Sequence, residues 1–202
     1  YINTPEGSKT YEGKFGPDVY TDHLIKFMRK HKEEPMCLYY PMALVHRNWV
    51  ASPDEPKAKS RLERHRSMVS YADKMVGKLI KSLDDLEMRD RTIVIFTTDN
   101  GTSPKADFEA LHKQGVHLCE NWRGYKADIY EGGHRVPFIV RWPGQISPAT
   151  RSDKIIVQTD LLATLAEIIN HRIPAEAGED SVSLWPLLSG KRKTDTPLHE
   201  AI

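Results

Sequence analysis

The stretch Arg-Thr-Ile-Val-Ile-Phe-Thr-Thr-Asp-Asn-Gly, residues 91–101, decides the fold. Its core from Ile93 to Phe96 is continuously apolar and mostly β-branched, which predicts a strand buried on both faces of a sheet. Asp99 and Asn100 follow at the carboxyl end of this strand, where α/β sheets gather ligands and where their oxygens suit a cation such as Ca²⁺. Asn-Gly after an apolar run is by itself more typical of a hairpin turn, so the surrounding sequence has to decide between the two.

Length and composition describe a chain that can fold around a sizeable core. With 202 residues, 39% of them hydrophobic, it predicts one domain or a large part of one. The 29 basic and 28 acidic residues form no long run of one sign, so we expect no nucleic-acid partner. No apolar stretch reaches the roughly eighteen residues that a membrane span needs. Cys37 and Cys119 show neither a CxxC nor a zinc spacing, which leaves the redox compartment undetermined.

Predicted helices and strands alternate along the chain. The helices cover about 17–31, 60–86 and 161–169, and the strands cover 36–40, 93–96 and 136–140. The alternation and the short connections predict an α/β fold in helix-sheet-helix layers. The apolar side chains expected to face the core from the last helix are Leu162, Leu165, Ile168 and Ile169.

Two polar regions lie between these elements. The first turns of the long helix carry Arg61, Arg64, His65 and Arg66, which we interpret as a solvated face. Residues 102–122 have no clear period, and a segment of this length in a compact domain indicates functional use or mobility.

Several motifs, taken in order, resemble a known family. They are Phe-Thr-Thr-Asp-Asn-Gly at 96–101, Arg-Gly-Tyr-Lys at 123–126 and Glu-Gly-Gly-His-Arg-Val-Pro-Phe-Ile-Val-Arg-Trp-Pro-Gly at 131–144, flanked by similar segments at 38–46 and 158–162. Together they resemble the second half of the catalytic domain of the arylsulfatase-type sulfatases, in the alkaline phosphatase superfamily. Each motif alone is weak, but their order and spacing make the match specific over about residues 17–190.

The resemblance implies a domain organisation. The fold would be helix-sheet-helix layered with a mixed, mostly parallel sheet that is incomplete on its amino-terminal side. Residues 1–190 would form part of the catalytic domain, and residues 191–202 would be an exposed linker toward a further region. We therefore interpret the chain as a fragment, and expect an isolated fragment to be marginally stable or to self-associate.

The resemblance also implies roles for four residues. Asp99 and Asn100 match the pair that helps to bind the active-site Ca²⁺, Lys126 matches a lysine that contacts the sulfate, and His46 matches a histidine that contacts the sulfate or its ester oxygen. A fixed cation, an ammonium and an imidazole around a sulfate ester stabilise the charge that develops in the transition state. Taken alone, Lys126 is typical of a surface lysine and His46 of a loop or packing histidine.

Two features depart from the family pattern. Arg47-Asn48-Trp49 follows His46 where the family usually has a proline within two positions, which affects the expected pose of the histidine. No Cys/Ser-x-Pro-x-Arg sequence occurs, although the family converts that cysteine or serine to the formylglycine nucleophile. The chain alone is therefore expected to be inactive.

The expected parent activity is hydrolysis of sulfate esters, acting on a sulfated small molecule or a sulfated glycan. A phosphatase or phosphodiesterase of the same superfamily is one alternative, because its metals and anion contacts obey the same electrostatics. A non-catalytic binding domain that kept the fold is another. The family resemblance implies a secreted, periplasmic or lysosomal protein.

Overall fold

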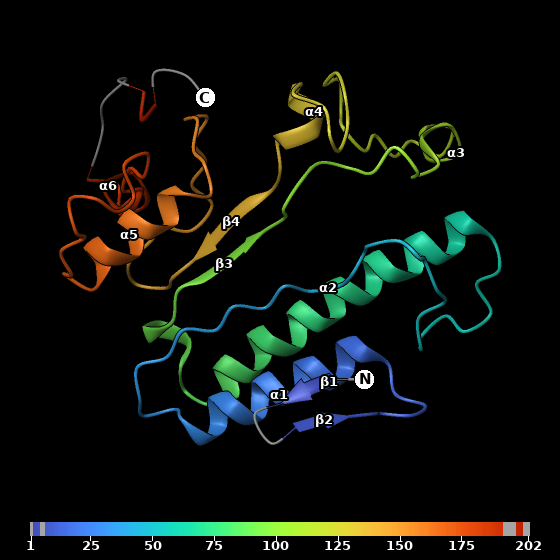
Figure 1. Cartoon of the computed structure of the whole chain (residues 1–202), viewed down its shortest axis with the longest axis horizontal. Coiled ribbons are helices and arrows are strands. Elements are labelled where there is room, and N and C mark those ends of the chain that lie inside the picture. The colour runs from blue at the N-terminus through green and yellow to red at the C-terminus, as the bar shows by residue number, and fades with distance from the viewer. Residues whose placement is uncertain (1, 5–6, 192–196, 200–202) are drawn as a thin grey trace. The chain divides into compact units, whose positions relative to one another are not determined.

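A computed structural model describes residues 2–4, 7–191 and 197–199. The chain separates into two compact units, Tyr1–Ile139 and Val140–Ile202, so the division falls within one strand. Figure 1 labels the elements, which are β1 (Ile2–Thr4), β2 (Gly7–Lys9), α1 (Gly16–Lys30), α2 (Arg61–Asp85), the 3-10 helix η1 (Arg89–Arg91), β3 (Val94–Thr97), α3 (Phe108–His112), α4 (Glu131–His134), β4 (Phe138–Arg141), α5 (Asp160–Ile168) and α6 (Trp185–Leu188).

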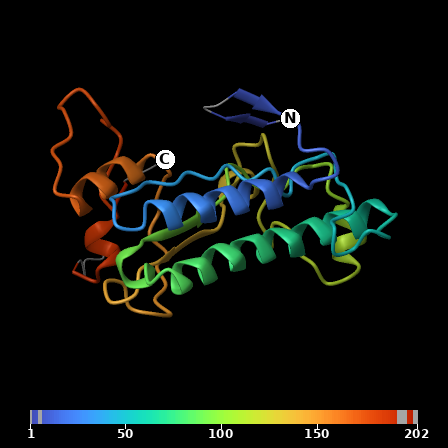
Figure 2. The ribbon, with the colours of Figure 1, turned by 90° about the horizontal axis from the view of Figure 1, so that it is seen from below.

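Two long helices, α1 and α2, dominate the first unit and lie side by side in both Figure 1 and Figure 2. The amino end of α2 is a capping box, in which Ser60 Oγ accepts from the N–H of Glu63 at 3.2 Å and the Glu63 carboxylate accepts from the N–H of Ser60 at 2.8 Å. These hydrogen bonds hold the pKa of the Glu63 carboxyl below its ordinary value. The long helix predicted from its apolar period is confirmed.

The core of the first unit joins the helix pair to β3. Met28 of α1, Leu83 of α2 and Met88 are buried together, and Val94 at the start of β3 packs against them. On the same helix pair, the Tyr71 hydroxyl donates to both carboxylate oxygens of Asp18 at 2.9 and 2.8 Å. Burial and this carboxylate raise the pKa of Tyr71. The two helices are therefore joined by apolar packing and by a partly buried hydrogen bond.

Strands β3 and β4 pair with each other, which confirms two of the predicted strands. Just beyond β3, the N–H of Gly101 donates to the carbonyl oxygen of Gly133, which lies shortly before β4. The carboxyl end of β3 is thus beside the amino end of β4, and the two strands run in opposite directions. The prediction that the apolar run is buried on both faces was wrong, because Phe96 is 39% exposed and its neighbours in β3 are half-buried. Full burial needs a covering layer on each face, and the described residues cover this strand incompletely.

The third predicted strand, Met36 to Tyr40, is not a strand in the structure. Cys37 is exposed rather than buried, and Tyr39 is 86% exposed. Residues that favour the extended conformation form a strand only when a neighbouring strand exchanges backbone hydrogen bonds with them. Among the described residues, no strand pairs with this segment.

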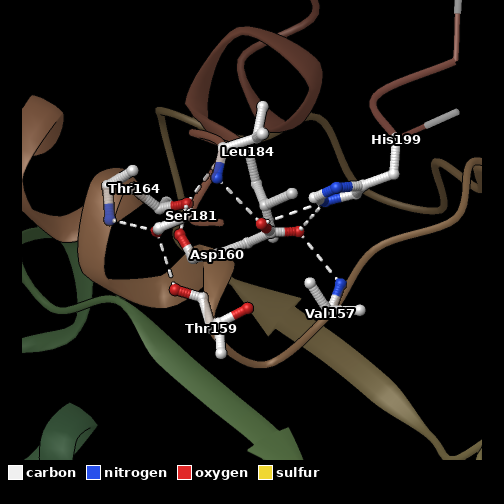
Figure 3. Close-up of polar contacts among 9 residues, drawn as sticks. Val157, Thr159, Asp160, Thr164, Ser181, Leu184 and His199 are labelled. Atoms are coloured by element: carbon white, nitrogen blue, oxygen red, sulfur yellow. Dashed lines mark hydrogen bonds and ion pairs between the residues drawn. The ribbon is translucent and has the colours of Figure 1, made fainter. Parts of the chain in front are cut away.

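In the second unit, the buried Asp160 at the start of α5 bonds the helix to the segments around it (Figure 3). The Asp160 carboxylate accepts from the backbone N–H groups of Val157 and Val182, both at 2.9 Å. It also lies 2.9 to 3.0 Å from Nε2 of His199, near the carboxyl end of the described chain. One turn further along α5, the Thr164 hydroxyl accepts from the N–H of Leu184 at 2.8 Å. A buried carboxylate with several donors orders the segments around it.

These contacts explain a wrong prediction about α5. Asp160, Thr164 and Ala166 are its buried residues, whereas Leu162 and Leu165 are exposed and Ile169 is 70% exposed. The polar groups at positions 160 and 164 hold residues 182–184, so this side of the helix is the one that is covered. The apolar period correctly located the helix but not its buried side.

Of the predicted exposed linker, residues 192–196 and 200–202 lie outside the described residues. Within 197–199, the His199 side chain is 13% exposed because it packs on Asp160. Across the part of the chain that the structure describes, no helix has both the length and the apolar character to cross a membrane.

Candidate functional site

The loop after β3 is held against the segment before β4 by backbone hydrogen bonds. Gly101 donates to the carbonyl oxygen of Gly133 at 2.8 Å, and the N–H of Lys126 donates to the carbonyl oxygen of Thr102 at 2.9 Å. Gly132 in turn donates to the carbonyl oxygen of Arg123 at 2.8 Å. Three segments that are separated in sequence, 99–102, 123–126 and 131–133, therefore meet within the first unit.

Three glycines make this close approach possible. A Cβ added to Gly101 would lie 2.0 Å from the carbonyl oxygen of Gly132, and one added to Gly132 would lie 2.1 Å from that of Gly124. For Gly133 the nearest atom would be the carbonyl oxygen of Asp128, at 2.1 Å. Neither Gly132 nor Gly133 has a positive φ. What they supply is room for backbone to pack against backbone.

Asp99 and Asn100 present oxygen atoms on this loop. Asp99 is exposed, and no hydrogen bond or ion pair within the described residues engages its carboxylate. The Asn100 side-chain nitrogen donates to the carbonyl oxygen of Gly101 at 3.0 Å, which leaves its side-chain oxygen as an available acceptor. These are hard oxygen ligands of the type that Ca²⁺ takes.

The fit of this pair to a calcium ion is partial. Ca²⁺ takes about six to eight oxygen ligands, whereas these two side chains give about two or three. Among the described residues there is no group of three or more His, Cys, Asp or Glu side chains that could hold a metal ion. The pair therefore has the chemistry of one side of a calcium site.

Lys126 is placed near this pair by its own backbone. Its N–H bonds to Thr102, which follows the Asp99-Asn100-Gly101 turn directly. The residue is half-buried, and its ammonium forms no hydrogen bond or ion pair with any described residue. A cation held near an exposed carboxylate and amide can bind an anion between itself and a metal ion.

His46 lies on the loop between α1 and α2. It is exposed, and its Nδ1 lies 2.5 Å from the carbonyl oxygen of Arg47. A carbonyl oxygen only accepts, so Nδ1 carries the proton and Nε2 is the nitrogen left for a ligand. No hydrogen bond or ion pair in the described residues joins His46 to Asp99, Asn100 or Lys126. Its convergence with the other three residues stays a prediction.

The sequence interpretation missed a basic pocket beside this region. It has a volume of about 490 Å³ and is lined by Arg47, Asn48, Trp49, Arg61, Arg64 and Lys105. Arg61, Arg64 and Arg66 are exposed, as the predicted solvated face requires, whereas His65 of the same set is half-buried. No sequence signal identifies this pocket, because its members come from three separate segments that only the fold brings together.

The chain is similar to a known protein family and to several characterised proteins. A family model described as Sulfatase matches residues 3–171. The N-acetylgalactosamine-6-O-sulfatase of Bacteroides thetaiotaomicron is 34% identical over 180 residues, which cover 88% of this chain and 35% of that protein. The chain spans about a third of the length of the curated relatives it matches.

Solved structures show the same relationship in three dimensions. One from Bacteroides thetaiotaomicron, described with the metabolism of multiple glycosaminoglycans, matches with a TM-score of 0.77 at 32% identity and covers 89% of this chain and 38% of that chain. Another, in complex with its substrate D-glucosamine-2-N,6-O-disulfate, has a TM-score of 0.69 at 17% identity and covers 91% of this chain and 54% of that one. At this lower identity the likeness concerns the fold alone. These matches confirm the predicted α/β fold class.

Proposed function

Because the chain belongs to the sulfatase family, we propose that it forms part of an enzyme that hydrolyses sulfate esters. The observation that carries this proposal is the hydrogen bond from the N–H of Lys126 to the carbonyl oxygen of Thr102. It keeps a lysine close to the Asp99-Asn100 pair although about twenty-five residues separate them along the chain. A half-buried lysine whose backbone is bonded next to a turn with available carboxylate and amide oxygens is suited to an anionic substrate that also contacts a metal ion.

Each residue has a distinct role in the proposal. Asp99 and Asn100 would hold Ca²⁺, which when bound supplies fixed positive charge beside the sulfate. Lys126 would donate to a sulfate oxygen, and its attraction grows as negative charge develops on the departing ester oxygen. His46, with Nδ1–H engaged by the Arg47 carbonyl, would direct Nε2 at that oxygen. In its imidazolium form it would donate the Nε2 proton to the oxygen as the ester bond breaks, which leaves the neutral imidazole with its proton on Nδ1.

The nucleophile would come from outside this chain. The formylglycine precursor sequence does not occur in these 202 residues, and the contexts of Cys37 and Cys119 do not provide it. In this proposal the residues present bind and orient a sulfate ester, and the group that attacks sulfur is supplied by another part of the parent protein. The chain would therefore contribute the residues that bind and orient the substrate in the active site of the parent protein.

The substrate proposed is a sulfated glycan. The relative with 34% identity is an N-acetylgalactosamine-6-O-sulfatase, and this supports a sulfated sugar as the substrate class. A sulfated small molecule such as an aryl sulfate is expected to serve as a simpler substrate, because the contacts described above address the sulfate group itself.

The test uses the full-length protein that contains this chain. Turnover of an aryl sulfate is measured for the unmodified protein, for Asp99→Ala and for a matched control, Asp73→Ala, which removes an exposed carboxylate from α2. We expect Asp99→Ala to reduce turnover by about a hundredfold or more and Asp73→Ala to leave it unchanged. Preferential hydrolysis of the matching phosphate ester, or equal turnover in both variants, would contradict the proposal.

A further inference from the structure

The basic pocket is built from three parts of the first unit. Arg47, Asn48 and Trp49 come from the loop before α2, Arg61 and Arg64 from the first turn of α2, and Lys105 from the segment after β3. A volume of about 490 Å³ exceeds that of a single small anion and falls in the range of pockets that hold small ligands. Five of its six lining residues are exposed, so the pocket is an open depression in the surface that a sugar ring with a charged substituent can reach.

Its charge is not balanced by acidic neighbours. The lining holds four cationic side chains and no carboxylate. None of the four forms an ion pair with any residue that the structure describes. The nearest acidic residue in sequence, Glu63, accepts from the N–H groups of Lys59 and Ser60 and is committed to the helix cap. An anion that enters the pocket meets uncompensated positive charge.

The arginines are also held in position before any ligand arrives. The guanidinium of Arg61 lies over the ring of Trp49, 5.0 Å from its centroid, and donates to the carbonyl oxygen of Lys105. Trp49 is fixed in turn, because its indole N–H donates to the carbonyl oxygen of Val45 at 3.0 Å. Nε of Arg64 donates to the carbonyl oxygen of Ala58 at 3.3 Å. A guanidinium has five donors, so both arginines keep N–H groups for a ligand.

The pocket adjoins the candidate site through short connections. Arg47 follows His46 directly, and Lys105 lies three residues after Thr102, which bonds to Lys126. The residues Arg47-Asn48-Trp49, which depart from the family pattern after His46, are the ones that line it.

We propose that this pocket binds a second anionic group of the substrate, a sulfate or a uronate carboxylate on a sugar next to the one that carries the reacting ester. The proposal rests on the proposed function for the identity of the reacting group. Arginine pairs in two-point fashion with both kinds of anion. The pocket would thus direct the enzyme toward glycans with more than one negative charge.

The experiment compares three disaccharides that carry the same reactive sulfate. The first has no other charge, the second has an added sulfate and the third has an added uronate carboxylate. For each, kcat/KM is measured with the full-length protein and with Arg61→Gln, Arg64→Gln and the control Arg66→Gln. Arg66 is a good control because it lies on the same helix outside the pocket and bonds to Gln114.

The unmodified protein should prefer at least one doubly charged disaccharide over the singly charged one by about tenfold or more. Arg61→Gln and Arg64→Gln should each reduce this ratio about tenfold, and Arg66→Gln should leave it unchanged. Whichever added group gives the larger preference identifies the natural anion. A ratio near one, or equal ratios in all variants, would overturn the proposal while leaving the sulfatase activity intact.

A binding measurement separates this proposal from the proposed function. Calorimetry with the disulfated disaccharide should show weaker binding in Arg61→Gln and Arg64→Gln than in Arg66→Gln. If this holds although no sulfate is released, the pocket is supported and the proposed activity fails. If a single-stranded RNA binds in an Arg61-dependent way and the disaccharides do not, the pocket serves another class of ligand and the proposal is overturned.

Discussion

The backbone of Gly101 is hydrogen-bonded to the backbone of Gly133, with 2.8 Å between the amide nitrogen and the carbonyl oxygen. This bond connects the turn that carries Asp99, after the end of β3, to the segment 131–133, which precedes β4. Gly132 in the same segment donates to the carbonyl oxygen of Arg123, in the segment that carries Lys126. Gly101 and Gly133 both lack a side chain that would hold their two segments apart. The position of the candidate site thus depends on contacts between backbone atoms.

Replacement of Gly133 by alanine should destabilise the protein. The new Cβ would lie 2.1 Å from the carbonyl oxygen of Asp128 and 2.8 Å from that of Tyr125, so backbone has to move. We expect a loss of about 1–3 kcal/mol in the free energy of unfolding, as for other overpacked sites, together with reduced turnover. Denaturant unfolding of the full-length protein measures the first effect.

Gly77→Ala is the matched control for this substitution. Gly77 lies inside α2, and a Cβ there would have nothing within 4 Å. Alanine should stabilise the helix at this position by about 0.5–1 kcal/mol. The same chemical change is therefore expected to act in opposite directions at the two positions, and a loss of similar size at both would contradict the packing argument.

The sequence predicts the long elements well because their signals are local. The apolar period of α2 extends over many turns, and Ser60 with Glu63 supplies a start signal that the structure realises as a capping box. The prediction of a strand at residues 36–40 is wrong for a complementary reason. Its residues favour a strand, but a strand also needs a partner elsewhere in the chain, and a local pattern carries no information about that partner.

The candidate site is predictable only in part. Asp99, Asn100 and Lys126 come from motifs that resemble a family, and the backbone bond from Lys126 to Thr102 agrees with their grouping. The basic pocket could not be predicted, because Arg61 on a helix and Lys105 on an irregular segment look like ordinary surface residues. Their relationship exists only after the chain has folded.

Lys126→Ala should affect turnover far more than stability. The Lys126 ammonium has no hydrogen-bond or ion-pair partner among the described residues, so its loss removes little from the folded state. A contact made to the transition state is worth about 2–4 kcal/mol, or roughly a hundredfold to a thousandfold in kcat. The control is Lys113→Ala, which removes an exposed lysine paired with Glu109. If Lys126→Ala turns over aryl sulfate as fast as the control, Lys126 is not in the site.

The free energy of unfolding should decrease at pH values below neutral because of His65. Burial lowers the pKa of this half-buried histidine from its ordinary value of 6.5, and its ring packs edge-on against Trp49 at 5.0 Å. Nδ1 is buried without a hydrogen-bond partner among the described residues. The unfolded chain therefore binds the proton more readily than the folded one. The contribution of neutral His65 to the free energy of unfolding is complete above pH 6.5 and is lost as the pH falls through the lower pKa of the folded state.

Urea unfolding between pH 5 and pH 8 measures this effect. His65→Gln should flatten the part of the stability profile that lies below about pH 6.5, because glutamine does not titrate. His171→Gln, at an exposed position, is the control and should leave the profile as it is. Identical profiles for the unmodified protein and His65→Gln would show that another group carries the dependence.

The last prediction concerns this 202-residue chain tested alone, which should hydrolyse no sulfate ester and should bind Ca²⁺ only weakly. No residue in it can be matured into the nucleophile, so the chain can orient a sulfate but not cleave its ester. Asp99 and Asn100 supply about two or three of the six to eight oxygens that Ca²⁺ takes, and water would have to supply the others.

The measurement compares this chain with the full-length protein in an aryl sulfate assay and in a calcium titration. Calcium binding should be much weaker in the short chain, and the residual binding should disappear in Asp99→Ala, because that carboxylate is the only charged ligand of the pair. Asp73→Ala should retain it. Turnover by the short chain that Asp99→Ala abolishes would show that a nucleophile lies within these residues and that Asp99 serves a complete active site. Turnover that survives Asp99→Ala would instead place the chemistry elsewhere in the chain.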